Sequence, residues 1–265
     1  TWSSLVEAGF SLGDRLLYRR TPMMHGDDVA ELQRRLSTLG FDSGGVDGIF
    51  GDATAVALAD FQRNSGLASD GIFGSRSLAE MGRLALRPAG DDLVSNLRDR
   101  VRAASAPTGL AGRKIAVGEQ GGFSVGVRAT CRRLSVAGAF PLPLHHPDES
   151  RQAAEANIAK VDCYIGIRLE PEHSSVITSY YRGYRYESET SRTLADLLHE
   201  ELVQALQLGR GGSTGMALPI LRETQMPAVL IELGAPQSVA ASTPRMASSI
   251  VRSLGQWMRL AWDRG

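Results

Sequence analysis

Apolar residues in the first third of the chain recur every three or four positions, which is the spacing of one face of an α-helix. Between residues 27 and 84 this pattern predicts three short helices separated by glycine-rich loops. Asp27 or Asp28, Asp52 and Ser75 are expected to cap these helices. The positions expected to face inward are Val29, Leu32, Leu36, Leu39, Leu58, Phe61, Leu78 and Met81. The sequence therefore predicts a small three-helix bundle.

A five-residue motif, Asp-Gly-Ile-Phe-Gly, occurs at residues 47–51 and again at 70–74, each time just before a predicted helix. Asp-Gly favours a turn, and the last glycine lets the chain enter the helix. The Ile and Phe side chains are expected to fasten the loop to the core. The repeat therefore predicts two equivalent helix entries.

Beyond residue 112, short apolar runs alternate with longer amphipathic stretches. Strands are predicted at residues 115–117, 140–144, 164–169, 175–181 and 228–233. Helices are predicted at residues 127–137, 148–160, 188–206 and 244–263, with a short strand or turn at 217–221. This alternation indicates an α/β sandwich with a mostly parallel sheet.

The same patterns divide the chain into a helical domain at residues 21–86 and an α/β domain at residues 112–265. Residues 1–20 are predicted to be the helical tail of a preceding module. Residues 87–111 contain Pro and Gly at both ends and are predicted to be a linker, with a helix at 92–104.

Composition narrows the classes of partner. The chain has 29 Lys and Arg and 29 Asp and Glu, so its net charge is zero. This balance removes the simplest electrostatic case for binding nucleic acid or an anionic membrane surface. No apolar run reaches the roughly 18 residues of a membrane-spanning helix. Cys131 and Cys163 do not make a disulfide framework, and we expect them to be buried free thiols.

The run Val-Asp-Gly-Ile-Phe-Gly at residues 46–51, with Gly-Asp-Asp-Val-Ala-Glu-Leu-Gln before it and a second Asp-Gly-Ile-Phe-Gly after it, resembles the peptidoglycan-binding type 1 domain. The resemblance covers the predicted helical domain. It implies a three-helix module that binds cell-wall glycopeptide, or a copy of that module that serves only as a spacer.

The second half resembles the zinc-dependent N-acetylmuramoyl-L-alanine amidases of the amidase type 3 family. The resemblance rests on Lys-Ile-Ala-Val-Gly-Glu-Gln-Gly-Gly at residues 114–122, Val-Asp-Cys-Tyr-Ile-Gly-Ile-Arg at 161–168 and Met-Pro-Ala-Val-Leu-Ile-Glu-Leu-Gly at 226–234. It implies an active site with one zinc ion, held by a His in the first glycine loop, a Glu after it and a His on the third strand. A Glu on the late strand is the base for the metal-bound water.

Matched to that pattern, Gln120, Val125 and Arg168 stand at the three metal positions, Glu170 replaces an Asn, and Glu232 keeps the position of the base. Zinc needs Cys, His or carboxylate ligands, whereas Gln is a poor ligand, Val is none and Arg is permanently positive. Without zinc, water keeps its pKa near 15.7 and gives no hydroxide at neutral pH. We therefore expect no metal or other cofactor and no amidase activity.

The resulting hypothesis is a catalytically inactive amidase-like protein that binds peptidoglycan, muropeptides or a wall-synthesis protein and regulates peptidoglycan metabolism. The chain most resembles actinobacterial amidase-like proteins, some of which regulate precursor synthesis inside the cell. This resemblance favours a cytoplasmic location and an enzyme of precursor synthesis as partner. A wall-associated or secreted location applies if a signal segment has been trimmed. The alternative is an active, zinc-dependent amidase that cleaves the bond between N-acetylmuramic acid and L-alanine.

Charge balance at the former metal site leads to a geometric hypothesis. The Arg168 guanidinium is expected to pair with Glu232, or with Glu119 in the neighbouring loop, because a lone buried carboxylate is costly. A separation of more than about 6 Å from both carboxylates would contradict this. The alternative is that Arg168 extends to solvent and Glu232 is only a relic.

Other candidates for binding lie outside the former metal positions. Tyr180, Tyr181, Tyr184 and Tyr186 surround Arg182 and Arg185, which suits a glycan or protein partner or an ordinary exposed ribbon. The binding candidates are Glu119, Glu170, Tyr180, Tyr181, Arg182 and Arg222.

Three further features have simple structural alternatives. His145 and His146 could bind a metal with His173 or Cys163, or could lie in a solvated loop. The glycines of residues 209–212 suggest a helix stop and a loop, with a phosphate or peptide contact as the alternative. The Ser and Thr residues at 188, 190, 191 and 193 are expected to cap a helix, with phosphorylation as the alternative.

Overall fold

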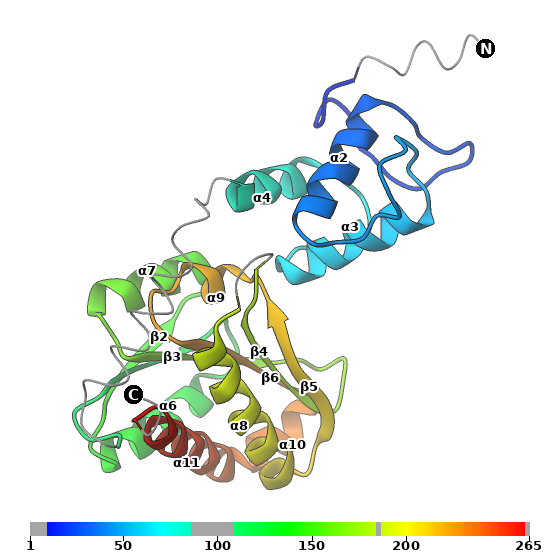
Figure 1. The fold of residues 1–265 in the computed structure, drawn as a ribbon. Coiled ribbons are helices and arrows are strands. Elements are labelled where there is room, and N and C mark those ends of the chain that lie inside the picture. Colours follow the sequence, from blue (N-terminus) through cyan, green and yellow to red (C-terminus); the bar gives the residue numbers. More distant parts are fainter. Residues whose placement is uncertain (1–9, 86–108, 184–186, 263–265) are drawn as a thin grey trace. The chain divides into compact units, whose positions relative to one another are not determined.

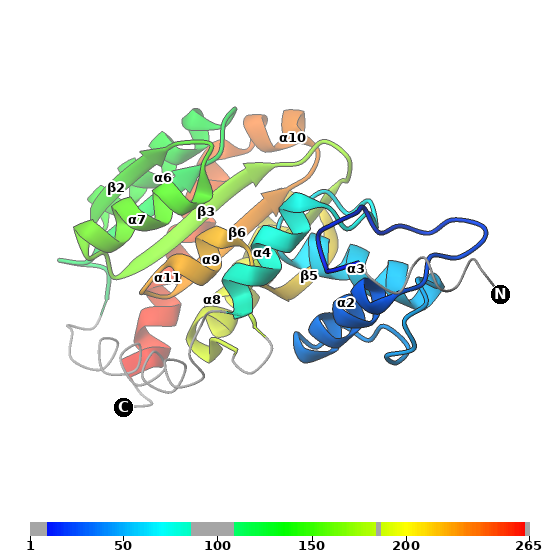
Figure 2. The same cartoon turned by 90° about the horizontal axis from the view of Figure 1, so that it is seen from above.

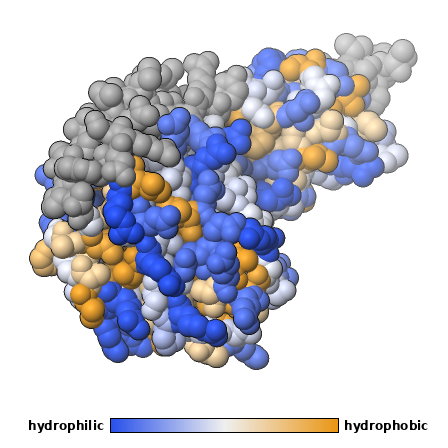
Figure 3. Space-filling model, turned by 60° about the horizontal axis from the view of Figure 1, so that its bottom comes forward, coloured by the Kyte–Doolittle hydropathy of each residue, from blue (hydrophilic) through white to orange (hydrophobic). Residues whose placement is uncertain are grey.

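The computed structural model describes residues 10–85, 109–183 and 187–262, which form two compact units, Thr1–Asp91 and Asp92–Gly265 (Figure 1). The predicted linker at 87–111 and its helix at 92–104 lie largely outside the described residues. No helix within the described ranges is long and apolar enough to cross a membrane. On the face that Figure 3 shows, hydrophilic and hydrophobic residues are interspersed.

The first unit contains the predicted bundle of three helices, α2 (Asp27–Thr38), α3 (Asp52–Asn64) and α4 (Ser75–Ala85). Their inward residues form one apolar core with Phe50 and Phe73. The cap prediction was wrong by one residue for two helices, because Gly26 and Gly51 are the N-caps of α2 and α3 and make no side-chain cap. Asp27 and Asp52 instead occupy the first turn, where a negative charge stabilises the helix by interacting with the positive end of its dipole.

Each Asp-Gly-Ile-Phe-Gly loop is held by a buried glutamine of the preceding helix. Gln33 donates to Asp47 Oδ1 at 2.8 Å and accepts from the Gly48 amide at 2.8 Å. Gln62 in the same way donates to Asp70 Oδ1 at 2.8 Å and accepts from the Gly71 amide at 2.9 Å. The two loops are therefore equivalent in their hydrogen bonds as well as in their sequence.

The prediction that both apolar side chains of the motif fasten the loop to the core holds only for phenylalanine. Phe50 and Phe73 are fully buried, whereas Ile49 and Ile72 are 43% and 41% exposed. The motif runs through isolated β-bridges at Ile49 and Phe73. Successive side chains of extended backbone point to opposite sides, so the neighbour of each buried Phe faces outward.

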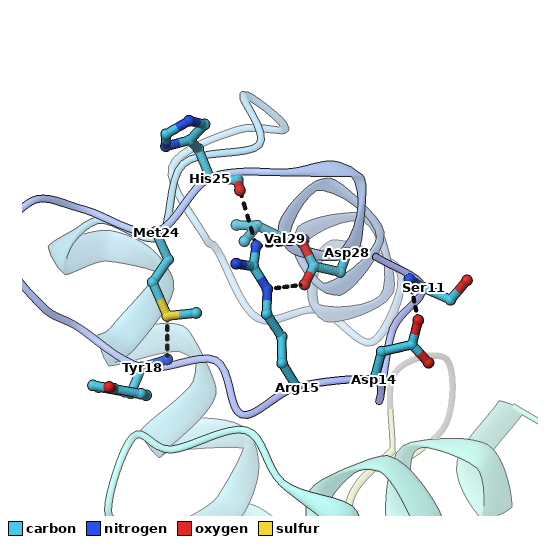
Figure 4. Close-up of polar contacts among 8 residues, drawn as sticks. All are labelled: Ser11, Asp14, Arg15, Tyr18, Met24, His25, Asp28 and Val29. Carbon is cyan, nitrogen blue, oxygen red and sulfur yellow. Dashed lines mark hydrogen bonds and ion pairs between the residues drawn. The ribbon is translucent and has the colours of Figure 1, made fainter. Parts of the chain in front are cut away.

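The described part of the predicted N-terminal tail, residues 10–20, is not helical. Leu17 is fully buried in the core of the bundle, and its amide donates to the Phe73 carbonyl at 3.1 Å. Arg15 forms an ion pair with the buried Asp28 at 2.7 Å and donates to the His25 carbonyl (Figure 4). These contacts make the segment part of the helical unit. Leu17 pairs with Phe73 in the second Asp-Gly-Ile-Phe-Gly loop and does not belong to the apolar face of a helix.

The second unit contains one sheet of six strands in the order β2-β1-β3-β6-β4-β5. The strands are β1 (Lys114–Glu119), β2 (Phe140–His145), β3 (Cys163–Leu169), β4 (Ser175–Tyr181), β5 (Gly209–Met216) and β6 (Ala228–Leu233). All neighbouring pairs are parallel except β4 and β6. The predicted α/β class with a mostly parallel sheet is therefore confirmed.

Helices cover both faces of this sheet (Figures 1 and 2). On one face lie α6 (Ser124–Val136), α8 (Glu189–Leu206), α10 (Pro236–Ala241) and α11 (Thr243–Trp262), which pack on the larger apolar core. On the other face lie α7 (Glu149–Ala159) and α9 (Pro219–Glu223), which pack on a smaller core. The Ser188 hydroxyl caps α8 by accepting from the Ser191 amide at 3.3 Å, as the sequence predicts.

Two predictions for the segment after α8 were wrong. The glycines of residues 209–212 do not form a loop but begin β5, an edge strand parallel to β4. Residues 217–221 form neither the predicted short strand nor a turn, because Pro219 starts the short helix α9 (Pro219–Glu223). A glycine-rich strand lacks the apolar alternation by which strands are recognised in a sequence. Residues 209–216 are extended because their backbone pairs with β4.

Candidate functional site

Three parallel strands bring the positions that the family resemblance assigns to a zinc ligand and to the base to one edge of the sheet. β1, β3 and β6 are in register, with Gly118 beside Gly166, Gly166 beside Leu230 and Arg168 beside Glu232. Because side chains alternate along a strand, Arg168 and Glu232 project from the face that α7 and α9 cover. The carboxyl edge of an open α/β sheet is a common position for ligand-binding groups.

Arg168 and Glu232 form an ion pair, with Nη2 of Arg168 3.3 Å from Oε1 of Glu232. The side chains are 30% and 18% exposed. Nε of Arg168 is buried and has no hydrogen-bond partner among the described residues. The charge pairing expected from the sequence is thus present, with Glu232 as the partner and not Glu119.

Glu119 lies on the opposite face of the sheet, where its carboxylate is bound separately. Its Oε1 is 3.0 Å from Nδ1 of His145, and its Oε2 accepts from the amides of Gly121 and Phe123 at 2.7 and 3.2 Å. Burial alone would raise the pKa of Glu119. The hydrogen bonds from His145 and from the two amides outweigh burial, so the pKa lies below its usual value. Glu119 thereby orders the glycine loop and the start of α6.

Gln120 is bound to a residue that the sequence did not single out. Its Nε2 donates to Oε1 of Glu149 at 2.5 Å, and Oε2 of Glu149 accepts from the Ile220 amide at 3.2 Å. Glu149 occupies the first turn of α7, so the contact joins the first loop to α7 and α9. The only sequence signal for it was the predicted start of a helix after residue 147.

A buried polar network forms the floor of the site. The Tyr164 hydroxyl donates to Oε1 of Gln152 at 2.8 Å, and Nε2 of Gln152 donates to the Glu119 carbonyl at 2.9 Å. Burial, assisted by the negative charge of Glu149, raises the pKa of Tyr164, so the phenol stays neutral. Gly118 passes over both groups, and a Cβ there would lie 2.1 Å from Gln152 Oε1. Apolar periodicity cannot reveal such a network, and sequence reasoning missed it.

The remaining predicted site residues lie apart from this pair. Val125 is 55% exposed in the first turn of α6, and Glu170 is half-buried just after β3. Arg222 is 5% exposed on α9 and pairs with Glu223 at 2.9 Å.

The tyrosine-rich edge is at the other end of the sheet, because β4 runs antiparallel to β6. Tyr180 is 5% exposed and donates to Glu187, which also pairs with Arg182 at 3.6 Å. Tyr181 is half-buried and packs against the smaller core. Tyr184, Arg185 and Tyr186 lie outside the described residues.

The donor set does not fit zinc. Gln120, Val125 and Arg168 supply no good ligand. In the part of the chain that the structure describes, no three His, Cys, Asp or Glu side chains come together closely enough to hold a metal ion. His145 is engaged by Glu119, and Cys163 is fully buried, so the alternative cluster with His146 and His173 is not assembled there.

Comparisons with known proteins match both units. Residues 25–81 match the putative peptidoglycan binding domain, and residues 145–243 match the N-acetylmuramoyl-L-alanine amidase family. The N-acetylmuramoyl-L-alanine amidase CwlM of Mycobacterium tuberculosis is 31% identical over 88% of this chain, and the match spans 65% of that protein. The spore cortex-lytic enzyme of Bacillus cereus is 50% identical over 20% of each chain.

Solved structures similar to this chain include the N-acetylmuramoyl-L-alanine amidases of Nostoc punctiforme and Mycobacterium abscessus. The first is 15% identical with a TM-score of 0.46, and the second is 16% identical with a TM-score of 0.47. Each match covers 56% of this chain and 99% of the solved one.

Proposed function

We propose that this protein, whose residues 25–81 match a peptidoglycan-binding domain and whose residues 145–243 match the N-acetylmuramoyl-L-alanine amidase family, is a non-catalytic relative of the amidases that acts by binding. Its ligand is peptidoglycan or a muropeptide. The observation that carries this proposal is the 3.3 Å ion pair between Arg168 and Glu232.

The ion pair occupies two positions that the family resemblance assigns to a zinc ligand and to the general base. A guanidinium is positively charged at every accessible pH, so it opposes a metal cation at the same place. The carboxylate of Glu232 is held by that charge and has no metal-bound water to deprotonate. The site therefore keeps groups that bind a ligand but lacks the group that activates water.

The helical unit supports the same proposal from a different direction. Residues 25–81 match the putative peptidoglycan binding domain, and both Asp-Gly-Ile-Phe-Gly loops of this unit keep the same hydrogen bonds to a buried glutamine. Regulation of peptidoglycan metabolism through an enzyme of precursor synthesis is the finer form of the proposal. It rests on the resemblance to actinobacterial amidase-like proteins.

One preparation of the protein tests binding and catalysis together. We expect retention on insoluble cell-wall material, no stoichiometric zinc by elemental analysis, and no release of peptide from peptidoglycan with or without added zinc. A zinc-dependent amidase assayed in parallel serves as the positive control. Peptide release that requires zinc would establish the rival function, an active amidase, whereas failure to bind wall material or muropeptides would refute the binding proposal.

Two substitutions sharpen this comparison. Arg168→His together with Gln120→His restores two histidines but leaves the position of the acidic ligand empty, because Val125 is retained. We expect no recovery of amidase activity in this variant, since zinc of the catalytic type takes three protein ligands. Full amidase activity in the double variant would show that Val125 is not needed as a metal ligand and that the two histidines alone restore catalysis.

A further inference from the structure

The ion pair at the former metal site is incompletely hydrogen-bonded. Among the described residues, neither Arg168 nor Glu232 makes a side-chain hydrogen bond, and the 3.3 Å contact between them is an ion pair without hydrogen-bond geometry. A guanidinium carries five N–H donors, and a carboxylate accepts from several directions. No other described protein group therefore occupies the remaining donor and acceptor positions of the pair, which a ligand can use.

Both groups can be reached from solvent, because the Arg168 and Glu232 side chains keep 30% and 18% exposure. Nε of Arg168 is buried, so a ligand must approach the guanidinium through its two Nη groups. These two nitrogens present parallel N–H groups, an arrangement that matches the two oxygens of a carboxylate.

Among the described residues, Glu232 is the only carboxylate that forms an ion pair with Arg168. Glu149 instead accepts from the Gln120 side chain and from the Ile220 amide. Glu119 lies on the opposite face of the sheet, where His145 and two backbone amides bind its carboxylate. The pair therefore offers one cationic donor and one anionic acceptor side by side.

We infer that this site recognises an amino-acid residue with a free α-carboxylate, as found in the peptide stems of muropeptides. The carboxylate accepts from the Nη groups of Arg168, and the N–H on the same carbon donates to Glu232. A ligand with both groups satisfies both members of the pair, whereas a lone anion would face Glu232 and a lone cation would face Arg168. This inference rests on the proposed function, because it names the chemistry of the ligand at the site.

Two muropeptides that differ in one group test the inference in the full chain. N-acetylmuramoyl-L-alanyl-D-glutamate has a free α-carboxylate, and N-acetylmuramoyl-L-alanyl-D-isoglutamine carries a carboxamide at the same place. By isothermal titration calorimetry we expect the first probe to bind at least about tenfold more tightly, the difference that one charge-assisted hydrogen bond produces.

Variants then assign the preference to the pair. Arg168→Gln is expected to abolish the preference, and so is Arg168→Gln with Glu232→Gln, which removes both charges and leaves no unpaired carboxylate. Arg151→Gln changes an arginine that is 63% exposed and is the matched control, which should keep the full preference. Thermal unfolding of each variant checks that it is folded.

The outcomes separate the inference from the proposed function. Equal affinity for both probes, or a preference that survives Arg168→Gln, overturns the inference but leaves the binding proposal standing if wall material is still retained. Absence of binding to both probes overturns the inference as well, and the wall-binding assay then decides the proposed function on its own.

Discussion

Gln33→Ala should destabilise the helical unit strongly, because one buried side chain holds a whole loop. Gln33 is 1% exposed. Its amide nitrogen lies 2.8–3.1 Å from Asp47 Oδ1, Thr54 Oγ1 and the Ile49 carbonyl, and its oxygen accepts from the Asp47 and Gly48 amides.

The magnitude follows from counting protons and acceptors. The amide nitrogen has two protons to share among three acceptors, so four hydrogen bonds are lost in total. At about 0.5–1.5 kcal/mol net for each bond, the free energy of unfolding should fall by about 2–6 kcal/mol. This is a large part of the roughly 5–15 kcal/mol that stabilises a typical domain.

Amide hydrogen exchange in the full chain measures this effect locally. In Gln33→Ala the Gly48 amide should exchange at least about thirtyfold faster, which corresponds to 2 kcal/mol, and protection of α2 and α3 should fall with it. Ser37→Ala, an exposed change on the same helix, is the matched control and should leave protection unchanged. Protection in Gln33→Ala equal to that of this control would refute the role given to the glutamine.

Three further predictions concern the amidase-like unit. Gly118→Ala should lower the unfolding free energy by about 1–3 kcal/mol in urea titration, because a Cβ would lie 2.1 Å from Gln152 Oε1; an unchanged midpoint would contradict the packing described. The pKa of Glu119 is lowered in the folded state, so its contribution to stability is complete above the ordinary value of 4.5 and is lost as pH falls through the folded pKa. Glu119→Gln should therefore be less stable than the wild type at pH 7, with the gap closing on acidification, and a gap that stays constant with pH would argue against it. Arg168→Gln should destabilise by about 1–2 kcal/mol after discounting for solvent screening, while Arg168→Gln with Glu232→Gln should recover most of that loss; additive losses in thermal unfolding would show that the two residues do not act as a pair.

The sequence was sufficient for most of the fold because the elements follow simple periodicities. The three helices of the first unit and strands such as β4 (Ser175–Tyr181) and β6 (Ala228–Leu233) lie where their apolar patterns predict them. It failed where local pattern does not decide the conformation. β5 (Gly209–Met216) has almost no apolar residues, and only its pairing with β4 makes it a strand.

The candidate site was predictable in part. The family resemblance placed Arg168 and Glu232 at one edge of the sheet, and charge balance predicted that Arg168 pairs with Glu232 or Glu119; the structure shows Glu232 as the partner. The role of Glu119 was not predictable, since a shift of one residue along β1 decides which face of the sheet a side chain occupies. Gln152 and Tyr164 were missed because they satisfy each other inside the protein and leave no trace in charge or hydropathy.

Gln33 and Gln62, each hydrogen-bonded to the Asp-Gly-Ile-Phe-Gly loop that follows its helix, form two glutamine clamps. These clamps show how the helical unit is connected. Asp47 and Asp70 are 23 residues apart, as are Thr54 and Ser77, the hydroxyl residues that the clamps reach. Helix α3 carries both parts, since Thr54 receives the first clamp and Gln62 forms the second. The unit is thus a linear series in which α2 binds the first loop, α3 is joined to that loop's glutamine and binds the second loop, and α4 is joined to the second glutamine. A further loop and helix with the same Asp, hydroxyl and Gln residues can be added or removed by duplication or deletion, and the same type of hydrogen bond would connect the remaining elements.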